Sequence, residues 1–180
     1  MRAWRRPVRS GARRSARAVT TNVLILCTHN AARSILGEAM LNHWSRQLGK
    51  DVRAHSAGSA PSGQVHPLAL HSLVDAGVAT EGLRSKSWND FVAPDAPRMR
   101  VVITVCDNAA AEACPYWAGS PVRVHWPYPD PSGAPEAARR AAFDLTRAAL
   151  GYRVLQLLAL PLESMDDGPL QAVLTSIART

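Results

Sequence analysis

Short segments rich in apolar and β-branched residues alternate along the chain with longer segments in which apolar residues recur at helical spacing. The short segments are typical of strands buried in a parallel sheet, and they lie at residues 22–26, 52–57, 100–105 and 122–125. The longer segments predict amphipathic helices at residues 34–48, 66–76, 137–160 and 168–178. A chain that passes repeatedly from strand to helix favours the α/β class, with a parallel sheet between helices on both faces.

Glycine and proline positions refine this pattern. We expect the long helix at 137–160 to break near Gly151, because glycine weakens a helix interior. Prolines at alternate positions within 127–133 predict an extended loop after the last strand, since proline resists both helix and ladder positions. A short helix is expected at 87–92.

The net charge of +7 does not describe the body of the chain. Seven of the 21 Lys and Arg residues lie within residues 1–18, which contain no acidic residue, so the other 14 balance the 14 Asp and Glu. This Arg-rich segment has too few apolar residues to form a core, and we expect a disordered tail. The tail has two alternative interpretations. It could contact nucleic acid or another acidic surface, or it could be a targeting peptide.

Residues 19–180 are expected to form a single catalytic domain. The domain is neutral, which argues against nucleic acid as a partner, and no apolar run reaches the ~18 residues needed to span a membrane. Three cysteines, Cys27, Cys106 and Cys114, favour a reducing compartment over a secreted disulfide framework. We therefore expect a soluble, cytoplasmic protein. No metal site is predicted, and zinc bound by Cys106, Cys114 and His125 is disfavoured because CxxC and HxxxH spacing is missing.

Three candidate reactive residues follow predicted strands. They are Cys27 after the first strand, Cys106 after the third and Asp130 beyond the fourth. The carboxyl ends of parallel strands meet at one edge of a sheet, where ligands bind near the change in strand order. We expect the three side chains to converge there.

The segment from Cys27 to Ser34 (CTHNAARS) has the composition of an oxyanion-binding loop. Its cysteine and Arg33 are separated by five residues, between a predicted strand and a predicted helix. The amides of such a turn and the helix N-terminus can surround a tetrahedral anion, and an arginine binds two of its oxygens. The same positive field is expected to lower the pKa of the Cys27 thiol and make it a nucleophile.

The whole loop is expected to surround the oxyanion, through Thr28, His29, Asn30, Ala31, Ala32, Arg33 and Ser34. Ser34 is expected to donate a hydrogen bond to the thiolate, and Asn30 to brace the loop with Ser56 as its outer partner. A Cys–Arg pair at this offset is weak evidence by itself. The alternative is a structural cysteine beside a helix-capping arginine.

This loop resembles the phosphate loop of the low-molecular-weight protein tyrosine phosphatases and of the arsenate reductases built on that fold. The resemblance continues through Ser56-Ala57-Gly58, Ser85-Lys86-Ser87-Trp88, Cys106-Asp107-Asn108, Cys114-Pro115, His125-Trp126 and Asp130-Pro131. It spans about residues 22–166, and the order and spacing of the motifs are similar to the arsenate reductase branch. It implies a flavodoxin-like three-layer fold with a four-stranded parallel sheet, and reduction of arsenate to arsenite for arsenic detoxification.

Three cysteines separate a reductase from a phosphatase, because reduction of arsenate consumes two electrons that thiols can supply. Cys27 is expected to attack arsenate while Asp130, at the position of the family's general acid, is protonated and assists loss of an oxygen as water. Cys106 then attacks the Cys27 sulfur and arsenite leaves. Cys114 next attacks Cys106 and moves the disulfide outward to a reductant. The plain alternatives are that Cys106 and Cys114 are small core residues and that Asp130 is a turn residue.

Two departures from the family pattern bear on the reductant. Ala31 stands where similar reductases commonly have a hydroxyl residue, and the spacing from Cys106 to Cys114 is one residue longer than in thioredoxin-coupled reductases. The reductant therefore stays open. It is either thioredoxin or a small thiol, namely glutathione with glutaredoxin or mycothiol with mycoredoxin. With a small thiol Cys114 would be dispensable. No tightly bound cofactor is expected.

Two other functions are weighed against reduction. A phosphatase for phosphotyrosine or a small phosphate ester would use the same Cys27 through a phosphocysteine, and a reductase could keep residual activity of this kind. Tyr128 stands alone before Asp130, whereas an aromatic pair often lines a phosphotyrosine site. A non-catalytic oxyanion-binding module is the second alternative, but it needs neither Asp130 nor three cysteines.

Overall fold

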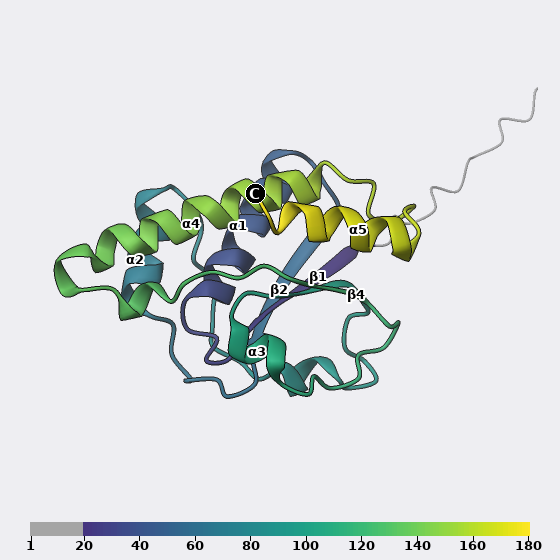
Figure 1. The fold of residues 1–180 in the computed structure, drawn as a ribbon, viewed down its shortest axis with the longest axis horizontal. Coiled ribbons are helices and arrows are strands. Elements are labelled where there is room, and N and C mark those ends of the chain that lie inside the picture. The colour runs from purple at the N-terminus through teal and green to yellow at the C-terminus, as the bar shows by residue number, and fades with distance from the viewer. Residues whose placement is uncertain (1–19) are drawn as a thin grey trace, which may run out of the picture.

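The computed structural model describes residues 20–180, which form a four-stranded parallel sheet packed against helices (Figure 1). The strands are β1 (Thr21–Cys27), β2 (Val52–Gly58), β3 (Met99–Thr104) and β4 (Val122–His125). Their order is β2-β1-β3-β4. Because β1 lies between β2 and β3, the change in strand order falls at its carboxyl end, where α/β sheets bind ligands. Each strand lies within one residue of its predicted bounds.

Five α-helices and two 3-10 helices connect and cover these strands in the described residues. They are α1 (Arg33–Gln47), α2 (Pro67–Asp75), η1 (Trp88–Phe91), α3 (Asp107–Ala111), η2 (Pro131–Gly133), α4 (Glu136–Leu158) and α5 (Asp167–Ile177). The predicted α/β class with a four-stranded parallel sheet is confirmed.

Different elements cover the two faces of the sheet. On one face, Val23 of β1 belongs to a large apolar cluster that includes residues of α1, α2, α4 and α5. On the other, Leu24 joins a smaller cluster with Phe91 of η1 and Trp117. Figure 1 shows α1, α4 and α5 grouped on one side of the strands and α3 on the other. Both faces of β1 are thus buried, which explains its uninterrupted apolar sequence.

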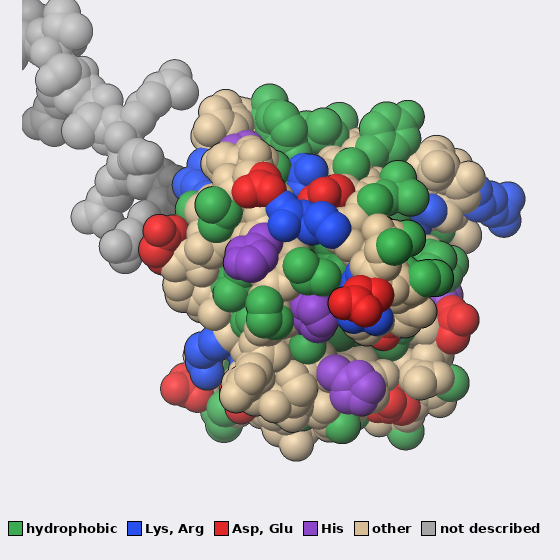
Figure 2. Space-filling view, turned by 90° about the vertical axis from the view of Figure 1, so that its left-hand side faces the viewer, with side chains coloured by type: hydrophobic (Ala, Val, Ile, Leu, Met, Phe, Trp, Pro, Cys, Tyr) green, Lys and Arg blue, Asp and Glu red, His purple; other side chains and the backbone are tan. Residues whose placement is uncertain are grey.

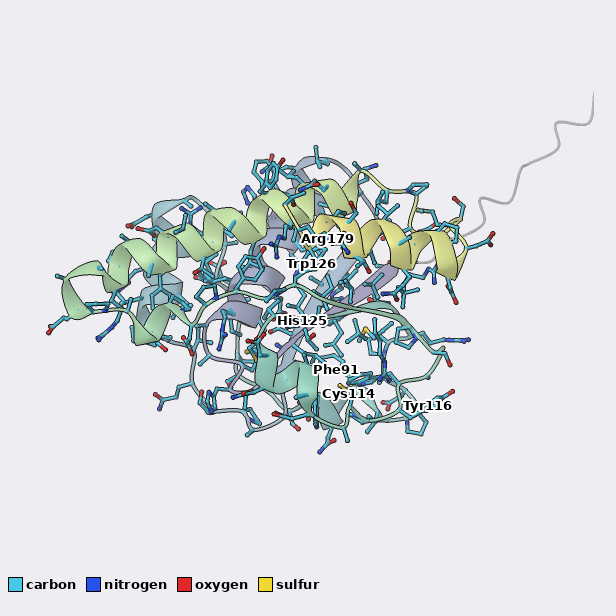
Figure 3. All side chains as sticks on the ribbon, viewed as in Figure 1. Phe91, Cys114, Tyr116, His125, Trp126 and Arg179 are labelled. Carbon is cyan, nitrogen blue, oxygen red and sulfur yellow. The ribbon has the colours of Figure 1, made fainter. Side chains whose placement is uncertain are left out.

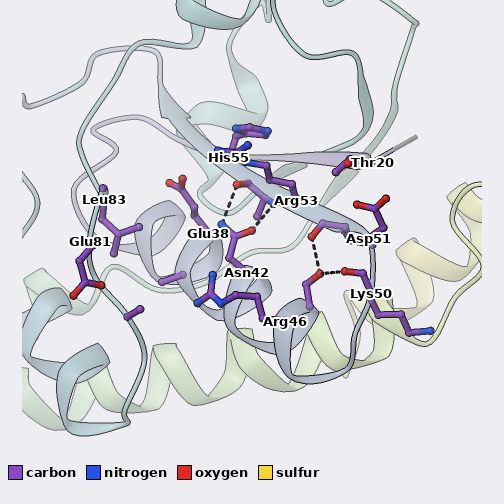
Figure 4. Close-up of a pocket in the computed structure, with 16 residues that line it drawn as sticks. Thr20, Glu38, Asn42, Arg46, Lys50, Asp51, Arg53, His55, Glu81 and Leu83 are labelled. Carbon is purple, nitrogen blue, oxygen red and sulfur yellow. Dashed lines mark hydrogen bonds between the residues drawn. The ribbon is translucent and has the colours of Figure 1, made fainter. Parts of the chain in front are cut away.

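Side chains of α1 cover the outer edge of β2. Asn42 donates to the Ala54 carbonyl at 3.1 Å and accepts from the Ala54 amide at 2.9 Å (Figure 4). Ser45 donates to the Val52 carbonyl at 2.6 Å. These bonds satisfy edge groups that would otherwise be available to a further strand.

One local prediction was wrong. α4 passes through Gly151 without a break. Gly151 faces α1, and a Cβ there would come within 2.7 Å of Met40 Cε, so the glycine allows close helix packing. No element was predicted between Cys106 and Cys114, and the first part of this segment forms α3.

Within residues 20–180, no helix combines the length and the apolar character needed to cross a membrane. Figure 2 shows one face of the molecule, on which acidic, basic and histidine side chains are interspersed with apolar ones. This mixture agrees with the balanced charge of the body of the chain. The prediction of a disordered tail falls on residues that lie outside the described part.

Candidate active site

The Cys27–Arg33 segment connects β1 directly to α1, as predicted. Asn30 has a φ of 46°, in the left-handed region that asparagine tolerates better than most residues. Gly58 of β2 lies against the loop, and a Cβ there would overlap the Thr28 carbonyl oxygen. Among described residues, the amides of Ala31, Ala32 and Arg33 donate to no protein acceptor. Free amides at a helix N-terminus are the donors that an anion needs.

A chain of polar side chains supports the Cys27 sulfur. Ser34 Oγ lies 2.8 Å from the sulfur, and the Asn30 amide donates to it at 3.2 Å. Asn30 Nδ2 donates to Ser34 Oγ at 2.8 Å and to Ser56 Oγ at 2.9 Å. The contacts predicted for Asn30, Ser34 and Ser56 are therefore all present.

The predicted lowering of the Cys27 pKa is contradicted. Burial raises the pKa of this thiol above its ordinary value, and the Cys106 thiol acts in the same direction. Hydrogen bonds from Ser34 and Asn30 act in the lowering direction without outweighing burial. Sequence reasoning relied on the charge of Arg33, which the structure shows to be paired with a carboxylate.

That carboxylate belongs to Asp130. Arg33 Nη2 lies 3.1 Å from Asp130 Oδ2, and Arg33 Nη1 donates to the Tyr128 carbonyl at 2.9 Å. Burial raises the pKa of Asp130, but hydrogen bonds from Ser132, together with Arg33 and His29, outweigh it and hold the pKa below its ordinary value. Asp130 is therefore ionised at neutral pH in this structure. The prediction that Asp130 is protonated does not hold for this resting state.

A cavity of about 60 Å³ lies over the sulfur. It is lined by Cys27, His29, Ala31, Ala32, Arg33, His66, Asp130 and Ser132. Sequence reasoning gave His66 no place in the site, because it is the N-cap residue of α2 and nothing in its local pattern points to Cys27. A larger cavity, about 570 Å³, lies elsewhere, between α1 and the edge of β2 (Figure 4). We place the site at the smaller cavity because the loop and the nucleophile are there.

Cys106 lies beside the loop. Its side chain is buried in the same apolar cluster as Cys27, and its sulfur is 3.5 Å from Thr28 Oγ1. Strand order explains this, because β1 and β3 are neighbours, Cys27 is the last residue of β1 and Cys106 lies two residues beyond β3.

Cys114 is separated from this pair. It is partly buried against the smaller cluster, with Phe91 and Trp117, and Figure 3 shows it near Phe91. Burial raises the pKa of its thiol and outweighs the opposite effect of Arg123. All three cysteines are free thiols. The structure thus brings Cys27 and Cys106 together and leaves Cys114 in a different apolar cluster.

Two supporting groups were missed by sequence reasoning. Lys86 Nζ lies 3.1 Å from Glu38 Oε2, and Ser56 donates to the same carboxylate oxygen. The signal available in the sequence was the position of Lys86 inside the Ser85–Trp88 motif. In residues 20–180, no group of three or more His, Cys, Asp or Glu side chains is arranged to hold a metal ion.

Comparison with known proteins agrees with this geometry. Residues 22–163 match the family of low molecular weight phosphotyrosine protein phosphatases. An arsenate reductase of Bacillus anthracis (strain CDC 684 / NRRL 3495) is 30% identical over 135 residues, which cover 73% of this chain and 90% of the relative. An arsenate reductase of Bacillus cereus (strain Q1) is 29% identical over 133 residues with the same coverage.

Solved structures are similar over most of the described residues. An arsenate reductase in the phosphate binding state is 25% identical, with a TM-score of 0.62, and the match covers 77% of this chain and 97% of that one. A thioredoxin-dependent arsenate reductase of Corynebacterium glutamicum is 27% identical, with a TM-score of 0.58, over 78% of this chain and 61% of that one. The chain therefore belongs to the low molecular weight phosphotyrosine protein phosphatase family, in the branch that contains the arsenate reductases.

Proposed function

We propose that this protein reduces arsenate to arsenite, with Cys27 as the nucleophile. The observation that carries the proposal is the second thiol beside the oxyanion loop: Cys106 shares the buried cluster of Cys27 and contacts Thr28. A phosphatase needs one thiol, whereas a reductase needs a second thiol to complete a disulfide. The relatives named arsenate reductase support the same choice.

Oxyanion binding rearranges the Arg33–Asp130 pair. An anion on the loop amides competes with the Asp130 carboxylate for the guanidinium, since both are negative. Asp130 then loses one of the groups that lower its pKa and gains a negative neighbour, so its pKa rises. Asp130 becomes a proton donor only in the complex, which reconciles its ionised resting state with a role as general acid.

Reduction then follows in two bond exchanges. The Cys27 thiolate forms a sulfur–arsenic bond, and one arsenic-bound oxygen leaves as water with a proton from Asp130. The Cys106 thiolate attacks the Cys27 sulfur, a disulfide forms, and the electron pair of the broken sulfur–arsenic bond reduces arsenic to arsenite. Cys114 attacks the Cys106 sulfur and frees Cys27. An external dithiol such as thioredoxin, or a small thiol with its own reductase, restores the resting state.

The lining of the cavity disfavours phosphotyrosine as substrate. Tyr128 is buried, its hydroxyl donates to the Ala149 carbonyl at 3.3 Å, and Arg153 covers its ring. It is therefore engaged with α4 and cannot hold a phenyl ring at the mouth of the site. A cavity of about 60 Å³ with no Phe, Tyr or Trp side chain in its lining suits an inorganic oxyanion better than an aryl ester.

A Cys106→Ser variant tests the proposal. We expect arsenate reduction with thioredoxin or a small thiol to be lost, while arsenate and phosphate still protect Cys27 from alkylation. Disulfide mapping by mass spectrometry should find Cys27–Cys106 in the wild-type protein after arsenate treatment and no such bridge in the variant. Full arsenate turnover in Cys106→Ser would contradict the proposal, and Ser176→Ala, at an exposed position of α5 with every thiol left in place, is the control.

A further inference from the structure

The Lys86–Glu38 ion pair lies outside the cavity over Cys27 but is connected to it by hydrogen bonds. The two side chains are only 8% and 12% exposed, and their charged atoms are 3.1 Å apart. Lys86 also lies within 3.4 Å of Ser56 Oγ, and its backbone amide donates to Asn30 Oδ1 at 2.8 Å. Glu38 projects from α1 and lines the large cavity beside β2 (Figure 4).

These contacts determine where each hydrogen in the network goes. An ionised Glu38 only accepts, so the Ser56 hydroxyl must donate to it. Ser56 Oγ is then an acceptor for Asn30 Nδ2.

Asn30 itself has one orientation, because its Oδ1 accepts from the Lys86 amide. Its second Nδ2 hydrogen goes to Ser34 Oγ, which leaves the Ser34 hydroxyl hydrogen for the Cys27 sulfur. The hydrogen-bond chain Ser56–Asn30–Ser34 therefore begins at an acceptor, Glu38, and ends with a donor directed at the nucleophile.

We propose that Lys86 and Glu38 are a positioning pair in which Lys86 balances the charge of the carboxylate that anchors this hydrogen-bond chain, so that the donor presented to the Cys27 sulfur can stabilise a thiolate. This inference rests on the proposed function, in which Cys27 is the nucleophile. The pair would make the Cys27 sulfur more nucleophilic although the side chain is buried. Lys86 neutralises the carboxylate, and without it a lone negative charge would face Ser56 and disfavour a thiolate nearby. The other titratable groups around the sulfur are Cys106, His29, Arg33, His66 and Asp130.

The test is the rate at which iodoacetamide alkylates Cys27 as a function of pH, in the full chain, followed by mass spectrometry of the peptide that carries Cys27. Because alkylation requires neither arsenate nor a reductant, it separates this inference from the proposed function. Lys86→Met should slow alkylation at neutral pH roughly three- to tenfold. Glu38→Gln keeps a side-chain oxygen that can accept from Ser56 but leaves the ammonium without its carboxylate, so it should accelerate alkylation by a similar factor.

Two controls accompany these variants. Lys86→Arg keeps the charge and should restore the wild-type rate. Lys50→Met removes the chain's other lysine, which is exposed, and should have no effect. Thermal unfolding confirms that each variant is folded.

Opposite shifts in Lys86→Met and Glu38→Gln support this charge balance, because loss of a purely structural pair would shift both variants in the same direction. An unchanged Lys86→Met profile, or shifts of the same sign, would overturn the inference. If Lys86→Met does not fold, the neutral double variant Lys86→Met/Glu38→Gln replaces it. Its rate should be close to wild type, and a rate at least threefold slower would overturn the inference. Absence of arsenate reduction in the wild-type protein would overturn the proposed function and leave this result intact.

Discussion

Asn30 combines two requirements that few residues meet. Its φ of 46° lies in the left-handed region, where asparagine is among the better tolerated side chains. Its side chain also makes three hydrogen bonds, to Ser34, to Ser56 and from the Lys86 amide. Glycine would satisfy the backbone, and a serine would satisfy part of the hydrogen bonding, but neither satisfies both. The loop thus depends on this residue for both its shape and its support.

Asp130 illustrates how a tertiary contact changes the state of one residue. Its proximity to Arg33 and its hydrogen bonds from Ser132 hold its pKa below the ordinary value, although burial acts in the opposite direction. The stability that this carboxylate contributes is present above its unfolded pKa and is lost as the pH falls through the lower, folded pKa. At neutral pH the resting site therefore contains an ion pair that an incoming oxyanion must displace.

We predict opposite effects on binding and turnover in Asp130→Asn. Without the competing carboxylate, phosphate should bind about two- to fivefold more tightly, since an exposed ion pair is worth little. Loss of the proton donor should slow arsenate reduction about a hundredfold. Calorimetric titration with phosphate and steady-state kinetics measure the two effects, with Asp75→Asn, an exposed carboxylate paired with Arg140 on α4, as the control. Weaker phosphate binding in Asp130→Asn would contradict the competition between carboxylate and anion.

At the scale of elements, β2 joins the edge of the sheet to the loop. Its Gly58 lies against Thr28, its Ser56 bonds to Asn30, and its outer edge is covered by Asn42 of α1. His55 of the same strand lies between these contacts and bonds to Asn22 of β1 through Nε2, at 3.1 Å. β2, whose sequence shows no functional motif of its own beyond Ser56-Ala57-Gly58, therefore supports both the Cys27–Arg33 loop and α1.

The charge state of His55 should make the stability of this strand depend on pH. Burial, with Arg53 and Lys86 nearby, lowers the pKa of His55 from 6.5 to about 4. Folding therefore favours the neutral ring, and its contribution is present above pH 6.5 and is lost as the pH falls from 6.5 towards 4. In His55→Gln, urea unfolding should show a smaller loss of stability between pH 7.5 and pH 5 than in the wild type. His71→Gln, on the exposed surface of α2, should keep the wild-type difference, and an equal difference in His55→Gln would refute this account.

At the scale of the whole molecule, strand order explains which thiols meet. β1 and β3 are neighbours, so Cys27 and Cys106 lie at the same end of adjacent strands. Cys114 follows α3 and packs with Phe91 and Trp117 in the other apolar cluster. Exchange of a Cys27–Cys106 disulfide for a Cys106–Cys114 disulfide therefore requires the 107–117 segment to leave its resting contacts.

This requirement has a measurable consequence. In Cys114→Ser treated with arsenate, the disulfide should stop at Cys27–Cys106, and amides of 107–117 should keep most of their resting protection from hydrogen exchange. In the wild-type protein carrying Cys106–Cys114, the same amides should exchange faster because α3 and the packing of Trp117 are disrupted. Equal exchange in both oxidised forms would argue against rearrangement of this segment, and amides of β1 serve as the internal reference.

Much of the secondary structure could be predicted from sequence, since the apolar runs of the strands and the helical spacing of α1, α4 and α5 depend only on which faces are buried. Gly151 misled the prediction because its role is set by Met40 on another helix. α3 was missed because five residues are too few for a periodic pattern. In the site, the loop from Cys27 to Ser34 was predictable since its residues are contiguous, whereas Lys86 and Glu38 are 48 positions apart and no local pattern relates them.

The order of residues along the chain was sufficient to identify the α/β class, the oxyanion loop and the three cysteines, because each depends on neighbours in sequence. Only the tertiary structure decided the charge state of the site. Burial of Cys27, the pairing of Arg33 with Asp130 and the neutralisation of Glu38 by Lys86 all arise from segments that meet in space. A pKa depends on desolvation and on charges a few ångströms away, and these distances exist only once the chain has folded.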